Sequence, residues 1–90
     1  MLTGTRIAFI GGGNMAEALL AGLLRKGVAV AEHLTVSDPD VHRRELLADR
    51  FGVAVHADNR AAAQGAELVV FCVEPQVLDA VLDEVASSLQ

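Results

Sequence analysis

A glycine-rich turn is the segment of this 90-residue chain whose residue types and spacing indicate chemistry. Residues 11–16 read Gly-Gly-Gly-Asn-Met-Ala and fit the pattern G-x-G-x-x-A, placed between an apolar run and an amphipathic segment. Gly11 permits a tight turn, and Gly13 lets backbone N–H groups approach a pyrophosphate without an intervening Cβ. The turn predicts a dinucleotide site at the start of a helix. A plain strand-to-helix turn and a methyltransferase cofactor loop are the alternatives, and the missing Lys-Ser or Lys-Thr excludes a mononucleotide P-loop.

An acidic residue follows the glycine turn at the spacing that a dinucleotide site requires. Asp38 comes about 20 residues after the turn, where a carboxylate meets the adenosine ribose hydroxyls of NAD. It is equally well placed as the N-cap of a helix that has Pro39 at its first position. Ser37 and the neighbouring Arg43 and Arg44 would favour a 2′-phosphate, which Asp38 would repel. Both NADH and NADPH therefore remain open, with a slight preference for NADH.

The elements that must position these residues alternate regularly along the chain. Short apolar runs predict strands at residues 6–10, 34–36, 53–55 and 67–72. Amphipathic or capped segments predict helices at residues 14–26, 39–50, 59–64 and from Pro75 onward. This order predicts an α/β fold, a Rossmann-like doubly wound parallel sheet of four strands with helices on both faces.

The bulk composition excludes several classes of function. Twelve acidic residues against seven basic ones give a net charge of −5, which argues against binding nucleic acid or an anionic membrane surface. The longest apolar run, residues 68–73, is far too short to span a bilayer. The single cysteine and the lack of a signal-peptide pattern predict a cytoplasmic protein. Its three histidines are spaced irregularly, so we expect no metal site.

Four short segments occur in an order typical of one enzyme family. They are residues 7–16 (Ile-Ala-Phe-Ile-Gly-Gly-Gly-Asn-Met-Ala), 37–39 (Ser-Asp-Pro), 58–59 (Asp-Asn) and 73–76 (Val-Glu-Pro-Gln). With them the chain resembles pyrroline-5-carboxylate reductases, which reduce 1-pyrroline-5-carboxylate to proline with a hydride from NADPH or NADH. The resemblance implies that residues 1–90 form the NAD(P)-binding domain. It also implies that a C-terminal helical domain, which makes the homo-oligomer and completes the site for the small imine substrate, is absent.

The same resemblance assigns cofactor contacts to residues that follow the four strands. They are Gly11, Gly13, Asn14, Met15, Ser37, Asp38, Asn59, Cys72, Val73 and Pro75. The glycine turn would line the pyrophosphate, and the Ser-Asp pair would meet the adenosine ribose or its phosphate. The asparagine would lie near the adenine, and the last three residues would pass the nicotinamide. We expect no catalytic acid or base within the 90 residues.

Several of these residues also have plainer interpretations. Met15 suits helix packing, Asn59 suits a helix cap, and Cys72 suits an inert buried thiol. Glu74 departs from the family, which usually has lysine there, and the reversed charge puts the cofactor preference in doubt. The rival functions are a β-hydroxyacid dehydrogenase, a coenzyme F420-dependent NADP reductase, or a nucleotide-binding module without catalysis.

Overall fold

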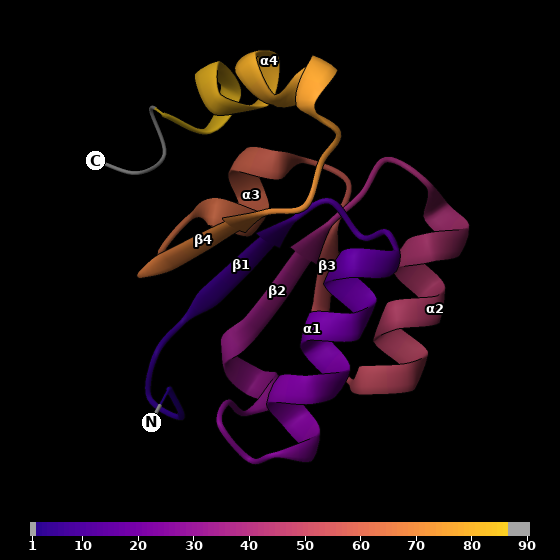
Figure 1. The fold of residues 1–90 in the computed structure, drawn as a ribbon, viewed down its shortest axis with the longest axis vertical. Helices are drawn as coiled ribbons and strands as arrows, with labels where there is room; N and C mark the ends of the chain where they lie inside the picture. Colours follow the sequence, from indigo (N-terminus) through magenta and orange to yellow (C-terminus); the bar gives the residue numbers. More distant parts are fainter. Residues whose placement is uncertain (1, 87–90) are drawn as a thin grey trace.

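Strands and helices alternate along the chain as the sequence predicts (Figure 1). The computed structural model describes residues 2–86. The strands are β1 (Ile7–Ile10), β2 (Leu34–Ser37), β3 (Ala54–His56) and β4 (Leu68–Phe71). The helices are α1 (Asn14–Arg25), α2 (Val41–Phe51), α3 (Asn59–Ala63) and α4 (Pro75–Ala86), and a three-residue 3₁₀ turn, η1 (Ala31–His33), precedes β2.

The four strands form one parallel sheet in the order β3-β2-β1-β4. Ile10 at the end of β1 pairs with Ser37 of β2 on one side and with Phe71 of β4 on the other. The loops that follow these three strands therefore leave the sheet at one common edge. The chain first proceeds to one side of β1 and then crosses to the other, so the sheet is doubly wound and its order reverses between β1 and β4. The predicted fold class is confirmed.

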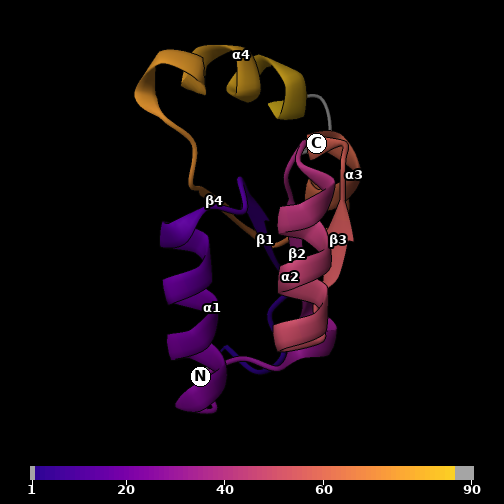
Figure 2. The same ribbon diagram turned by 90° about the vertical axis from the view of Figure 1, so that its right-hand side faces the viewer.

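Helices cover both faces of the sheet, and alternate residues of β1 separate the two halves of the core. Phe9 packs in a buried cluster with Leu20 of α1 and Leu47 of α2. Ile10 points to the other face and packs with Ala62 of α3 and Val85 of α4. Figures 1 and 2 show α1 and α2 side by side on one face, whereas α4 lies beyond α3 near the ends of the strands.

The sequence prediction for the start of the second helix is wrong. The N-cap of α2 is Asp40, whose carboxylate accepts a hydrogen bond from the backbone N–H of His42 at 2.9 Å. Asp38 does not cap the helix, because its two carboxylate oxygens accept the backbone N–H groups of Gly12 and Asp40. Pro39 consequently lies in the turn before the helix. Two aspartates flank Pro39. Because Asp38 accepts the N–H of Gly12, Asp40 is the one that caps the helix.

The interpretation of Asn59 as a helix cap is also wrong. Asp58 caps α3, since its carboxylate accepts the N–H of Arg60 at 2.9 Å, and Asn59 is the first helical residue. The side chain of Asn59 is therefore available for contacts with other elements.

The last helix buries only part of its predicted apolar stripe. Val81 and Val85 are buried against α3 and β1, whereas Val77 and Leu82 stay largely exposed. Among residues 2–86, none of the helices has the length and apolar content that crossing a bilayer requires.

Adjacent leucines of α2 provide a matched test of this packing. Leu47 is completely buried, whereas Leu46 is 43% exposed. We expect Leu47→Ala to lower the free energy of unfolding by about 2–5 kcal/mol, because it leaves a cavity beneath the sheet. Leu46→Ala should change it by about 0.5 kcal/mol. Chemical denaturation of both variants measures the difference, and equal losses would contradict this placement of α2.

Candidate functional site

A groove of about 410 Å³ opens where the strand order reverses, at the ends of β1 and β4. Its lining comes from residues 11–15 of the glycine turn, from Asp38 and Pro39 after β2, and from residues 72–74, 76 and 77 after β4. Ligands of open α/β sheets bind at such a reversal, outside the carboxyl ends of the strands. The position and the residues of this groove therefore make it the candidate site.

Most of the residues expected from the sequence meet in this groove. Those that line it are Gly11, Gly13, Asn14, Met15, Asp38, Cys72 and Val73. Met15 is 61% exposed, so it is not packed into the core. Pro75 lies outside the lining, as the first residue of α4.

Ser37 and Asn59 are placed together, but away from the groove lining. Ser37 is fully buried, and its hydroxyl donates a hydrogen bond to Oδ1 of Asn59 at 2.6 Å. Nδ2 of Asn59 in turn donates to Oε1 of Glu84 on α4 at 2.9 Å. These bonds link the end of β2 to α3 and α4. In this structure both predicted contact residues thus hold elements of the fold together.

Two glycines of the turn are constrained in different ways. Gly11 has φ of +104°, and a Cβ at this position would lie 2.6 Å from the carbonyl oxygen of Cys72. Only glycine fits there without moving the backbone at Cys72, just after β4. Gly13 has φ of −80°, and a Cβ on it would meet no atom of residues 2–86 within 4 Å. The fold therefore requires glycine at position 11, but it does not require glycine at position 13.

The helix that begins at the groove differs from α2 and α3 at its N-terminus. Asp40 and Asp58 cap α2 and α3, whereas Gly13 occupies the N-cap of α1, where no side chain within residues 2–86 accepts its first N–H groups. Uncapped N–H groups and the positive end of the helix dipole favour an anionic ligand. The start of α1 is therefore suited to hold a phosphate group.

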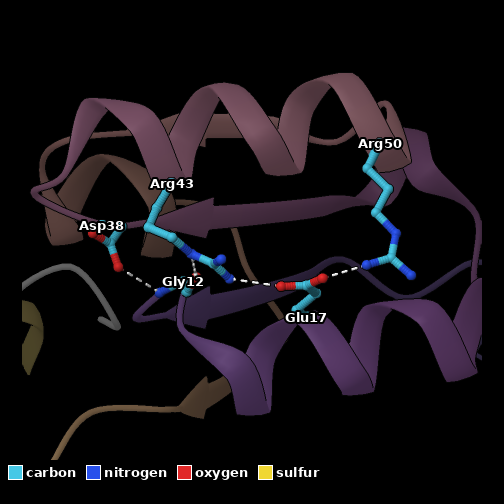
Figure 3. A network of polar contacts seen from close by, with 5 residues as sticks. All are labelled: Gly12, Glu17, Asp38, Arg43 and Arg50. Atoms are coloured by element: carbon cyan, nitrogen blue, oxygen red, sulfur yellow. Dashed lines mark hydrogen bonds and ion pairs between the residues drawn. The ribbon is translucent and has the colours of Figure 1, made fainter.

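The turn itself is fixed by side chains from the segment after β2 (Figure 3). The N–H of Gly12 donates to Oδ2 of Asp38 at 2.9 Å, and its carbonyl oxygen accepts from Nε of Arg43 at 2.7 Å. Nη2 of Arg43 also contacts Oε1 of Glu17 at 2.9 Å, and Arg50 forms a second ion pair with Glu17. One network therefore connects α2, the glycine turn and the first turn of α1.

Sequence reasoning missed this role of Arg43 and Glu17. From the sequence, Glu17 looks like a carboxylate in the first turn of a helix, and Arg43 like a possible phosphate ligand. The available signal was the seven-residue spacing of Arg43 and Arg50, which places both cations on one face of α2. That both arginines pair with Glu17 depends on how α1 and α2 pack, which the sequence does not show.

The charged side chains that line the groove are acidic. Asp38 and Glu74 line it, and no lysine or arginine among residues 2–86 belongs to its lining. The Glu74 carboxylate is exposed and accepts a hydrogen bond from Nε2 of Gln76 at 2.9 Å. A bound anion would consequently be held by backbone N–H groups, with side-chain charges opposing it.

The groove is also lined by the thiol of Cys72. Partial burial removes Cys72 from water and raises the pKa of its thiol, which keeps the thiol protonated and weakly nucleophilic at neutral pH. Within residues 2–86, no three His, Cys, Asp or Glu side chains are close enough to hold a metal ion.

The predicted resemblance to pyrroline-5-carboxylate reductases is confirmed by comparison with known proteins. The pyrroline-5-carboxylate reductase of Pseudomonas aeruginosa is 41% identical over 85 residues, which are 94% of this chain and 31% of that protein. A solved pyrroline-5-carboxylate reductase from Coxiella burnetii superposes with a TM-score of 0.88 at 31% identity, over 92% of this chain and 30% of the other. The chain thus spans about three-tenths of the length of these relatives.

A more distant structure agrees in fold. Pyrroline carboxylate reductase of Plasmodium falciparum, solved with NADP bound, superposes with a TM-score of 0.80 at 21% identity, over 97% of this chain and 30% of that one. A profile of the family described as NADP oxidoreductase, coenzyme F420-dependent, matches residues 6–90. The chain therefore belongs to this family of NADP oxidoreductases.

Proposed function

We propose that residues 1–90 form the nicotinamide-dinucleotide-binding domain of a pyrroline-5-carboxylate reductase. The observation that carries this proposal is the glycine turn, which opens onto the groove at the point where the strand order reverses. Similarity to the Pseudomonas aeruginosa and Coxiella burnetii reductases supports the choice of enzyme.

The residues of the groove fit a dinucleotide. The open space at Gly13 and the uncapped N–H groups of α1 suit a pyrophosphate, which Asn14 and Met15 would also contact. Asp38, Cys72 and Val73 line the groove. In this proposal Asp38 would meet the adenosine ribose, and Cys72 and Val73 would lie beside the nicotinamide. When bound, the cofactor supplies the hydride, whereas the protein positions it.

The other predicted contact residues have a positioning role in this proposal. Ser37 and Asn59 hold the end of β2 against α3 and α4, and Pro75 begins the helix that follows the groove. The groove would therefore depend on their hydrogen bonds and backbone conformation.

The rest of the enzyme is proposed to come from sequence beyond this domain, because the chain covers 31% of the Pseudomonas aeruginosa reductase. That part would complete the site for the imine and make the homo-oligomer.

We further propose a cytoplasmic location, consistent with the single cysteine.

A coenzyme F420-dependent NADP reductase is the second candidate, because the matching family carries that description. Assays of the enzyme that contains this domain separate the two functions. Oxidation of NADH or NADPH that depends on 1-pyrroline-5-carboxylate supports the reductase proposal. Electron exchange with coenzyme F420, together with no reaction of the imine, would favour the second candidate. Nucleotide binding without either reaction would indicate a non-catalytic module.

Glycine-to-alanine variants test whether the turn holds the nucleotide. Gly13→Ala should weaken the binding of NADH and NADPH at least about tenfold, because the added methyl group occupies the space for the pyrophosphate. Gly22→Ala in the interior of α1 is the matched control. A Cβ at Gly22 would also lie more than 4 Å from any neighbouring atom of residues 2–86. Titration calorimetry measures the affinities, and thermal unfolding confirms both folds. Equal affinities in the two variants would mean that the phosphates bind elsewhere.

Reversing one charge of the groove tests the electrostatic argument. Glu74→Lys should tighten nucleotide binding by roughly 1 kcal/mol, or about fivefold, because it replaces a repelling carboxylate with a cation. Asp79→Lys makes the same change of charge at an exposed position of α4 outside the groove lining, and it should alter the affinity much less. The difference should shrink as salt is added, because salt screens exposed charges. An equal gain in both variants would show that only net charge matters.

A further inference from the structure

We propose that this groove selects NADH over NADPH, with Asp38 as the residue that discriminates between them. The inference rests on the proposed function, because it concerns the nucleotide that the same groove would hold. It is carried by the different partners of four polar side chains around the end of β2: Ser37, Asp38, Arg43 and Arg44.

Ser37, whose hydroxyl could donate a hydrogen bond to a 2′-phosphate, is turned away from the groove. The hydroxyl of Ser37 is buried and donates its hydrogen to Asn59, on the face of the sheet that α3 covers. Thr35, two residues earlier on the same side of β2, likewise donates to the carbonyl oxygen of Ala62 in α3. Ser37 therefore offers no hydroxyl to a ligand in the groove.

The side chain that does line the groove is a carboxylate in a fixed position. Its Oδ2 accepts the N–H of Gly12 at 2.9 Å, and its Oδ1 accepts the N–H of Asp40 at 2.8 Å. Each carboxylate oxygen keeps a further lone pair, which can accept a hydrogen bond from a ribose hydroxyl. A 2′-phosphate is mostly doubly deprotonated at neutral pH and would be repelled by the carboxylate of Asp38.

The nearby arginines are engaged with the protein. Arg43 directs Nε to the carbonyl oxygen of Gly12 and Nη2 to Glu17. Arg44 donates Nη1 to the carbonyl oxygen of Asp38 at 2.8 Å. If Arg43 turned to a phosphate, the Gly12 carbonyl oxygen would lose its donor, and the half-buried Glu17 carboxylate would keep only Arg50. The cations that the sequence places near the site thus stabilise the turn.

The charge of the groove acts in the same direction. Its lining carries the carboxylates of Asp38 and Glu74, and within residues 2–86 it contains no basic side chain. A 2′-phosphate adds a further charge of roughly −1.5 to −2 at neutral pH. NADPH therefore meets more repulsion than NADH, and no side-chain cation of the lining compensates for it.

Binding of NADH and NADPH to the purified protein tests the proposal directly, by titration calorimetry without any enzymatic readout. We expect NADH to bind at least about tenfold more tightly than NADPH. Equal affinities, or tighter binding of NADPH, would overturn the selectivity while leaving the proposed function intact. Failure of both nucleotides to bind would overturn the proposed function together with this inference.

Two serine variants assign the selectivity to a residue. Asp38→Ser should reduce the preference for NADH at least about fivefold, because it removes the carboxylate and supplies a hydroxyl. Asp40→Ser is the control: it removes the same charge two residues away, outside the groove lining, and serine still caps a helix. An equal change in both variants would refute the role of Asp38. If Asp38→Ser unfolds in a thermal melt, Asp38→Asn, which keeps the shape without the charge, should reduce the preference in the same way, and an unchanged preference would refute it.

Discussion

Both backbone polar groups of Gly12 are bound by side chains that follow β2, and the candidate site depends on this constraint. Asp38 accepts the N–H, and Arg43 donates to the carbonyl oxygen. The glycine turn is thereby attached to α2 as well as to its own strand and helix. With the turn fixed, the first N–H groups of α1 remain directed toward the groove. The site is therefore preorganised by hydrogen bonds that need no ligand.

The same arrangement explains why a chain with seven basic residues has an acidic groove. The guanidinium groups of Arg43 and Arg50 both contact Glu17, and neither belongs to the groove lining. Cations hold the two helices together, while backbone N–H groups at the start of α1 face the groove. In the proposed function, the N–H groups at the start of α1 would supply the binding strength, and the side-chain charges of the groove would discriminate between ligands.

The sequence predicts the sheet and the position of the groove well, because both depend on local patterns. Apolar runs mark the strands, and the glycine spacing identifies the turn between β1 and α1. The sequence predicts side-chain partners less well, because these depend on which elements pack together. Two aspartates flank Pro39, and the local sequence does not distinguish them. Asp38 binds the N–H of Gly12 from another element, and Asp40 caps the helix. Similarly, side chains alternate between the two faces of the sheet along β2, which places Ser37 on the face covered by α3, where it contacts Asn59.

Gly11 and Gly13 look equivalent in the sequence, but the fold constrains them differently. The backbone of Cys72 excludes any side chain at Gly11, whereas no neighbouring atom of residues 2–86 excludes one at Gly13. If the groove holds a nucleotide as proposed, a descendant that no longer bound one would still need glycine at the first position to fold. At the second position it would be free to accumulate substitutions. Variation at Gly13 beside an unchanged Gly11 would therefore identify lineages in which this fold has lost its ligand.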